Sequence, residues 1–211
     1  SDIVLANTFG ANRQKFESDE YELEDIITTA IINVKEGAYM GVRDGREVYA
    51  ALDLGPTGKL LKPMGTLSFE EAYDTYKEVV IYGAEAGADL IHIETMSDTY
   101  EAKAAVLAAK ENTSLPVFVT TVFDEKGKLL TGADVISVVA LLEGLRVDAI
   151  GMNCSLGPEQ MIPLLKQMRE YSSLPLIAKP NAGMPVIDEK GVAHYNMDAE
   201  HFGKSMKKLI E

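Results

Sequence analysis

A strand, a turn and a helix start follow one another in Asp148-Ala149-Ile150-Gly151-Met152-Asn153-Cys154-Ser155-Leu156-Gly157-Pro158. The run Asp148–Met152 has the length and apolar character of a buried strand. Pro158 suits the first turn of a helix, where its missing N–H costs nothing. This order of elements is the repeating unit of a parallel α/β protein.

The same pattern recurs along the chain. Longer stretches with helical spacing separate the runs, and Ser68 with Glu71 and Asp98 with Glu101 have the spacing of a capping box at a helix start. Parallel strands covered by helices on their faces read as continuous apolar runs. Six such strands are predicted, at Asp2–Ala6, Val48–Leu52, Leu90–Ile93, Pro116–Thr121, Asp148–Met152 and Leu176–Ala178.

Polar residues follow every predicted strand. In a closed barrel the chemistry gathers at the carboxyl ends of the strands, whereas an open sheet concentrates it at one switch point. The glycine fingerprint of a dinucleotide site is also absent. We therefore predict a TIM-type (β/α)8 barrel with its pocket at this rim. The residues concerned are Asn7-Thr8, Asp53, Glu94-Thr95, Thr120-Thr121, Asn153-Cys154 and Lys179-Pro180-Asn181.

Composition narrows the class of protein. The chain has 211 residues, of which 46% are hydrophobic and 25% charged, with one cysteine and a net charge of −13. These values predict one globular domain over residues 1–211, in a cytoplasmic protein without a disulfide framework. No apolar run approaches the ~18 residues of a membrane helix, so no membrane partner is expected. The acidic balance without a basic stripe makes nucleic acid an unlikely partner.

Local patterns add smaller predictions. Asp124–Gly127 and Asp188–Gly191 share the letters of a tight hairpin turn. The acidic stretch Glu17–Asp25 is expected to start the first helix, where carboxylates suit the helix dipole. His194 and His201 are expected at the surface. Core or helix-packing roles, rather than a cofactor site, are expected for Met40, Met64, Met96, Met152 and Met161.

Cys154 has two interpretations. A lone cysteine is usually a small buried hydrophobe. Here it stands between a strand and a helix start, where the helix amide end would stabilise a thiolate.

Gly55–Gly58 lacks the spacing of a phosphate-binding loop, so a tight turn is expected there.

At this point the sequence resembles the homocysteine S-methyltransferase family. The matching motifs run through the chain in the family's order, and the family fold is a (β/α)8 barrel. They are Ala6-Asn7-Thr8-Phe9-Gly10-Ala11-Asn12, Leu52–Gly58, Pro63-Met64-Gly65, Ile93-Glu94-Thr95-Met96, Gly151–Pro158 and Lys179-Pro180-Asn181-Ala182-Gly183.

The resemblance implies roles for particular residues. Family members transfer a methyl group to the sulfur of homocysteine, giving methionine. Cys154 matches the first zinc ligand of the family, and Glu94 matches the acid that holds the homocysteine amino group. Zinc bound by three thiolates keeps a fourth position for the substrate sulfur, which stays nucleophilic when deprotonated. Further substrate-binding residues are expected at Asn7, Asp53, Asn153 and Asn181.

The resemblance also implies cofactors and partners. Zinc is expected as the cofactor, and methylcobalamin carried by another domain is the expected methyl donor, with S-methylmethionine or betaine as alternatives. Folate-binding and cobalamin-binding domains of the same or an associated chain are the expected protein partners.

The sequence departs from the family pattern in two places. It has no adjacent cysteine pair to supply the other two zinc ligands, and the match covers only the second to seventh strands of the family barrel. An incomplete barrel from a longer chain is therefore expected. His92 or Glu94 are conceivable substitute ligands, although a core-facing, hydrogen-bonded His92 is favoured.

Two other functions stay open. Lys179 ends a strand, where a lysine in an aldolase-like barrel forms a Schiff base with a carbonyl substrate. The missing zinc ligands also leave room for a non-catalytic fragment that binds homocysteine or serves as a scaffold.

Overall fold

The computed structural model describes residues 1–211 except 19, 43–44, 184, 196 and 211. Strands and helices alternate along the chain, and the six predicted strands are all present. Their bounds are β1 Ile3–Leu5, α1 Leu23–Gly41, β2 Tyr49–Leu54, α2 Phe69–Glu85, β3 Leu90–Met96, α3 Thr99–Asn112, β4 Val117–Thr121, α4 Val135–Gly144, β5 Ala149–Asn153, α5 Pro158–Tyr171, β6 Leu176–Lys179, β7 Pro185–Ile187, β8 Ala193–Tyr195 and α6 Ala199–Ile210.

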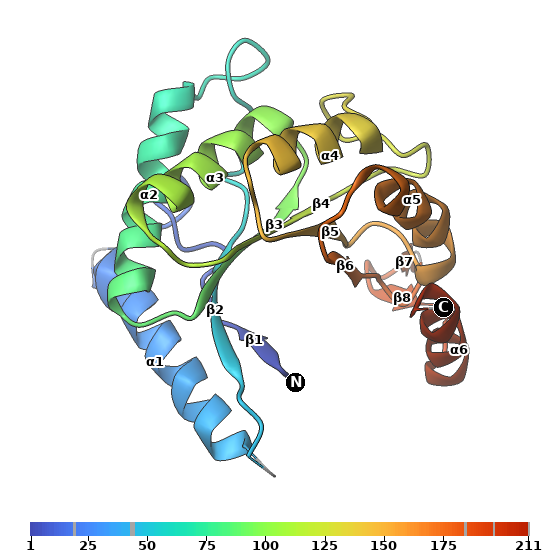
Figure 1. Ribbon diagram of the computed structural model, residues 1–211, viewed down its shortest axis with the longest axis horizontal. Coiled ribbons are helices and arrows are strands. Elements are labelled where there is room, and N and C mark those ends of the chain that lie inside the picture. Colours follow the sequence, from blue (N-terminus) through green and yellow to red (C-terminus); the bar gives the residue numbers. More distant parts are fainter. Residues whose placement is uncertain (19, 43–44, 184, 196, 211) are drawn as a thin grey trace.

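The main sheet is a curled arc of six parallel strands. The strands are ordered β1-β2-β3-β4-β5-β6, so each pairs with its neighbour in the sequence. Helices α1 to α5 cover the convex side, and the concave side faces inward (Figure 1). The arrangement is an incomplete (β/α)8 barrel, which confirms the predicted fold class.

The apolar core lies between the sheet and its helices. Leu52, Ile91, Ile93 and Ile150 project outward from the strands and are fully buried against the helix layer. The residues between them along β2 and β3 point to the concave side, because side chains alternate along a strand. The register pairs Asp53 with His92. One face of each strand therefore builds the core and the other builds the concave surface.

Four strands extend further than the sequence predicted. β2 runs to Leu54 and β3 runs to Met96, so Asp53, Glu94 and Thr95 lie inside strands instead of after them. In the same way β5 ends at Asn153 and β6 ends at Lys179. The sequence prediction stopped at the first polar residue. A polar residue continues a strand when its side chain faces an accessible concave surface, as these acids do.

Helix starts follow the predicted signals with one exception. Ser68 and Glu71 form a reciprocal capping box at α2, and Pro158 opens α5. Asp98 caps α3 by accepting from the Tyr100 N–H at 3.0 Å, but Glu101 does not return the contact and binds elsewhere. The predicted capping box at α3 is therefore only half formed.

The acidic stretch also differs from its prediction. Helix α1 begins at Leu23, so Glu24 and Asp25 lie in its first turn while Glu17 precedes the helix.

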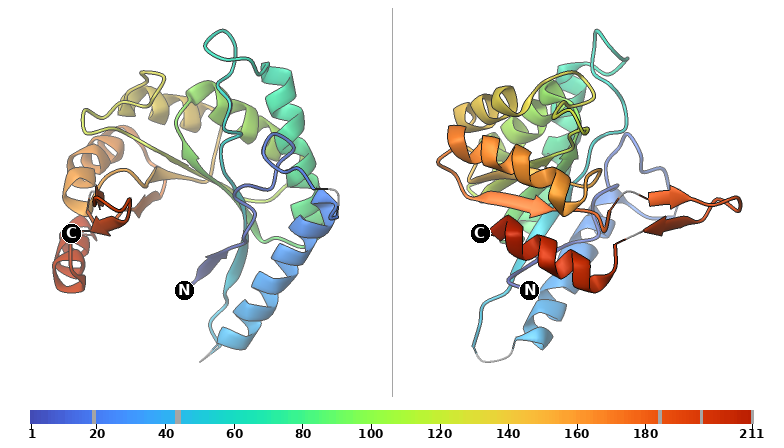
Figure 2. Two further views of the ribbon diagram at one scale, coloured as in Figure 1. Left: turned by 180° about the vertical axis from the view of Figure 1, so that it is seen from behind. Right: turned by 90° about the vertical axis from the view of Figure 1, so that its right-hand side faces the viewer.

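Both predicted tight turns are present. The Asp124 carboxylate accepts from the N–H groups of Lys126 and Lys128, and the Asp188 carboxylate accepts from those of Lys190 and Val192. The second turn joins β7 to β8 in an antiparallel hairpin that projects from the body of the fold (Figure 2).

The methionine prediction is correct for three residues and wrong for two. Met96, Met152 and Met161 are buried, whereas Met40 is 81% exposed and Met64 is 62% exposed. Met40 lies in the last turn of α1, and Met64 lies in the loop before α2. Neither position faces the core. Within the described residues, no helix combines the length and apolar character required to cross a bilayer.

Candidate active site

Acidic and basic side chains gather on the concave side of the sheet. His92 and Lys179 line a cavity of about 220 Å³ together with apolar residues from β1, β3, β4 and β6. Glu94 lies two residues beyond His92 on β3 and therefore shares its face. The carboxyl half of the concave side is consequently polar and its amino half is apolar.

Glu94 and Lys179 form an ion pair across this concave side. The Lys179 ammonium donates to Oε2 of Glu94 although β3 and β6 are separated by two other strands. The Glu94 side chain is 13% exposed and that of Lys179 is 39% exposed. Burial alone would raise the pKa of Glu94, but His92 and Lys179 outweigh burial and hold this pKa below its usual value. Glu94 is therefore an anionic group at the edge of a cavity.

Asp53 supplies a second, different carboxyl group. Its backbone is fixed by Thr8, whose hydroxyl donates to the Asp53 carbonyl at 2.8 Å and accepts from the Asp53 N–H at 3.1 Å. The side chain is buried, and Oδ1 has no partner among the described residues. Burial, with the nearby Glu94 charge, raises the pKa of Asp53 to about 7, against the opposing effect of Lys179.

Two more buried polar atoms on this side lack a hydrogen-bond partner within the described chain, namely Nε2 of His92 and Oγ1 of Thr120. His92 was predicted to be core-facing and hydrogen-bonded. It is 4% exposed and Nε2 lies 3.4 Å from Oε2 of Glu94, outside hydrogen-bond geometry. The burial prediction is confirmed and the hydrogen-bond prediction is wrong. Unpartnered buried polar groups are costly, so their concentration here marks a surface suited to a polar ligand.

Cys154 lies on the turn directly after β5 and is exposed. Cys154 and Ser155 both have positive φ, 56° and 58°, which is uncommon for residues with a Cβ and is often found at functional sites. The Cys154 N–H donates to the Lys179 carbonyl at 3.1 Å. The turn thus presents the sulfur beside the end of β6.

Asn153 connects this turn to the end of β3. Its Oδ1 accepts from the Thr95 N–H at 3.0 Å, and its Nδ2 lies 2.7 Å from Thr95 Oγ1 and 3.3 Å from Sγ of Cys154. Thr95 also has a positive φ of 63°. The buried amide therefore fixes the backbone next to Glu94 and contacts the sulfur at the same time. This link could not be predicted from local sequence, because Thr95 and Asn153 are far apart along the chain.

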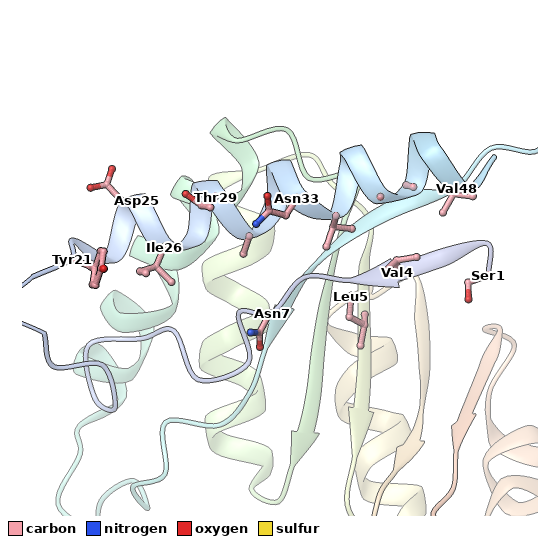
Figure 3. A pocket seen from close by; sticks show the side chains of 15 residues that line it. Ser1, Val4, Leu5, Asn7, Tyr21, Asp25, Ile26, Thr29, Asn33 and Val48 are labelled. Atoms are coloured by element: carbon pink, nitrogen blue, oxygen red, sulfur yellow. The ribbon is translucent and has the colours of Figure 1, made fainter.

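The remaining predicted substrate residues occupy different places. The Asn181 N–H donates to the Leu156 carbonyl at 3.0 Å, so Asn181 lies beside the Cys154 turn. Asn7 instead lines a groove of about 780 Å³ between β1 and α1 (Figure 3). In the part of the chain that the structure describes, no hydrogen bond joins Asn7 to Glu94 or Cys154. His194 and His201 lie at the surface, as predicted.

The loop at Gly55–Gly58 is held by a residue that the sequence analysis assigned only to a cap. The buried Glu101 carboxylate accepts from the Thr57 N–H at 2.7 Å, the Thr57 hydroxyl at 2.6 Å and the Tyr76 hydroxyl at 2.9 Å. Gly55–Gly58 form a loop that bends at Gly58 and not the predicted hydrogen-bonded tight turn, because Glu101 satisfies the Thr57 N–H instead. No single-sequence signal distinguishes this role from capping.

The donor set does not fit zinc by itself. Within the residues described, no three His, Cys, Asp or Glu side chains lie close enough together to hold a metal ion. Cys154 is the one thiol of the chain. Neither His92 nor Glu94 completes a metal site with it.

Lys179 is poorly placed for a Schiff base. An amine must be unprotonated to attack a carbonyl group. The amine end of Lys179 is engaged by the Glu94 carboxylate instead. This geometry argues against the aldolase-like alternative.

Polar groups at the carboxyl ends of parallel strands, on the inner side of a barrel arc, define the class of a barrel enzyme with a rim site. The family model for homocysteine S-methyltransferase matches residues 1–211. The chain belongs to the homocysteine S-methyltransferase family.

Two curated relatives are methionine synthases. That of Mycobacterium tuberculosis (strain ATCC 25618 / H37Rv) is 31% identical over 221 residues, and that of Mycobacterium leprae (strain TN) is 29% identical over 222 residues. Each match includes 100% of this chain, and the chain spans 18% of the length of each relative.

Solved structures support the fold. The metallated form of the homocysteine methyltransferase MmuM from Escherichia coli matches with a TM-score of 0.74 at 23% identity, covering 87% of this chain and 68% of that one. Its oxidized form matches with a TM-score of 0.74 at 21% identity, covering 86% and 66%.

Proposed function

We propose that this chain binds homocysteine and takes part in methyl transfer to its sulfur, giving methionine. The observation that carries the proposal is the juxtaposition of Glu94, Asn153 and Cys154 in a chain that belongs to this family throughout its length. A substrate with an ammonium group and a thiol needs an anion at one end and a sulfur-binding group at the other.

Glu94 is proposed to bind the substrate ammonium. It is anionic, largely buried and placed at the cavity edge, where a charge-assisted hydrogen bond is strong. Asp53 is proposed as a second acceptor beside it, because Oδ1 is buried and unpartnered among the described residues.

Asn153 and Asn181 are proposed to shape the pocket by holding backbone. Both amide nitrogen and oxygen atoms of the Asn153 side chain are engaged within the protein, so it acts as a positioning residue. The Asn181 backbone holds the loop after β6 against the Cys154 turn. Holding both ends of the substrate on rigid elements aligns the attacking sulfur.

Cys154 is proposed to be one zinc ligand, with the others supplied from outside the described residues. The exposed sulfur and its Asn153 contact support this role. In the full-length protein, Cys154→Ser should lower the zinc content measured by elemental analysis, with Ser155→Ala as the matched control. Full zinc retention in Cys154→Ser would reject Cys154 as a ligand.

Methylcobalamin is proposed as the methyl donor, carried by a cobalamin-binding domain that works with a folate-binding domain and this barrel unit of residues 1–211. The similarity to two methionine synthases that are much longer than this chain supports that context. S-methylmethionine and betaine are the alternative donors.

The test is methionine formation by the full-length protein from homocysteine with each donor in turn. Turnover with methylcobalamin supports the proposal, and turnover only with S-methylmethionine or betaine changes the donor. Homocysteine binding measured by calorimetry without turnover on any donor would indicate the non-catalytic alternative. Absence of both binding and turnover would reject the proposed function.

A further inference from the structure

The ion pair between Glu94 and Lys179 occupies the group that the proposed function reserves for the substrate. Glu94 is the proposed acceptor for the homocysteine ammonium, yet its Oε2 already accepts from an ammonium of the protein itself. A carboxylate oxygen that is paired with one ammonium pairs less strongly with a second. A substrate ammonium that takes Oε2 therefore displaces Lys179.

The side chain of Lys179 has the freedom to change position. Its ammonium stands on a flexible four-carbon stem, and its side chain is 39% exposed. Its backbone, in contrast, is fixed in β6 by pairing with Asn153 and by the Cys154 N–H bonded to its carbonyl. The charged end can leave Glu94 while the residue stays beside the Cys154 turn.

Displacement without compensation is unfavourable, because it breaks a partly buried ion pair. Homocysteine itself supplies a new partner for the displaced lysine. Its carboxylate is attached to the same carbon as its ammonium, so an ammonium bound at Glu94 places an anion within reach of the released lysine. One internal ion pair then becomes two, Glu94 to the substrate ammonium and the substrate carboxylate to Lys179.

We propose that Lys179 is a specificity-determining residue that leaves Glu94 when homocysteine binds and pairs with the α-carboxylate of the substrate. This rests on the proposed function, because Glu94 must be the ammonium acceptor. The site would then select amino acid zwitterions with a free carboxylate over simple aminothiols, since an amine without a carboxylate leaves Lys179 unpaired.

The test compares two ligands on the full-length protein by titration calorimetry. Homocysteine is one, and 3-aminopropane-1-thiol, which is homocysteine without its carboxylate, is the other. A charge-assisted contact contributes about 1.5–3 kcal/mol, so the wild type should prefer homocysteine by about 10-fold to 150-fold. Lys179→Met should reduce this preference to less than about 3-fold, and Lys179→Arg should keep most of it.

The matched control is Lys128→Met. Lys128 lies in the loop after β4 and pairs with Asp134 at 3.2 Å with its side chain 46% exposed, so the variant loses the same charge from an exposed pair away from the site. Its preference should equal that of the wild type. Lys179→Gln is a second variant in case Lys179→Met does not fold, as judged by thermal melting, and it should lose the preference likewise.

Three results would overturn the inference and leave the proposed function standing. Equal weakening of both ligands in Lys179→Met would make Lys179 a structural residue. Tighter binding of both would mean that it only competes for Glu94. A wild type without preference would mean that the released lysine finds another acceptor, such as Asp53. Failure of the wild type to bind homocysteine at all would instead reject the proposed function.

Discussion

Glu101 and Glu94 are two partly or fully buried carboxylates with opposite surroundings. Glu101 accepts three hydrogen bonds, all from groups that are fixed in the fold. Glu94 is held by the end of a flexible lysine, and this lysine lines a cavity together with His92, whose Nε2 has no hydrogen-bond partner within the described chain. The partners of Glu101 cannot leave without a change of fold, whereas the charged end of Lys179 is 39% exposed and can move away from Glu94. A buried carboxylate is therefore not by itself the sign of a binding site. A buried carboxylate whose ion-pair partner is a flexible side chain is a better candidate.

The largest expected effect is the loss of protein stability when Glu101 is replaced. Glu101→Ala removes the acceptor of the Thr57 N–H and leaves the Thr57 and Tyr76 hydroxyls only their longer contacts to the Lys59 and Gly55 carbonyls, at 3.2 Å and 3.3 Å. This loss should reduce the free energy of unfolding by about 3–5 kcal/mol. Denaturant titration measures this change in the free energy of unfolding. Glu101→Gln keeps the shape and one acceptor oxygen and should lose less. A loss below about 1 kcal/mol in Glu101→Ala would remove the contrast with Glu94.

Asp53 should make stability depend on pH. Its pKa is about 7 in the folded protein, above the ordinary 3.8, so the folded state binds the proton more tightly. This contribution to stability is complete below about pH 4 and is lost as the pH rises to about 7, by up to about 4 kcal/mol.

Asp53→Asn tests this dependence, because it keeps the shape and removes the titration. The difference in unfolding free energy between wild type and variant should change in favour of the variant from pH 4.5 to pH 8. A difference that is constant with pH would show that Asp53 keeps an ordinary pKa.

Glu94→Gln should act on binding more than on stability. Loss of the carboxylate should weaken homocysteine binding by about 10-fold to 150-fold in calorimetry, because a charged acceptor is lost. The released Lys179 reaches water, so the melting temperature should change little. Unchanged affinity would exclude Glu94 as the ammonium acceptor.

The smallest effect is expected at a surface carboxylate away from the site. Glu78 pairs with Arg13 at 3.0 Å on the surface, and exposed pairs contribute little. Glu78→Gln should change the unfolding free energy by less than about 1 kcal/mol and leave homocysteine affinity unchanged. A larger loss of affinity would show that any change in net charge weakens binding. The loss of affinity in Glu94→Gln would then not identify Glu94 as the ammonium acceptor.

The fold was largely predictable because its signals are local. Apolar runs, Ser68 with its partner, and Pro158 act within a few residues, and each element that they predict is present. Errors arose where three-dimensional context decides. Met40 was assigned to packing, although it lies on the exposed end of α1. Asp53 was placed after its strand, although the concave face accommodates a polar residue inside it.

The candidate site was predictable only residue by residue. Glu94 and Cys154 were selected from their motifs, but their connection through Asn153 and Thr95 is a contact between distant strands. The pairing of Glu94 with Lys179 depends on the curl of the sheet, which brings β3 and β6 together across the concave side. The local sequence indicates neither the curvature of the sheet nor which side chains reach one another across it.

Gly151 has a consequence for substrate length. A Cβ at this position would collide with the Ile177 carbonyl, so the absence of a side chain permits the close pairing of β5 with β6. Through that pairing, the spacing between the Cys154 turn and the end of β6 that carries Lys179 is a property of the backbone. For the proposed substrate homocysteine, this fixed backbone spacing predicts weaker binding of cysteine, which is one methylene shorter.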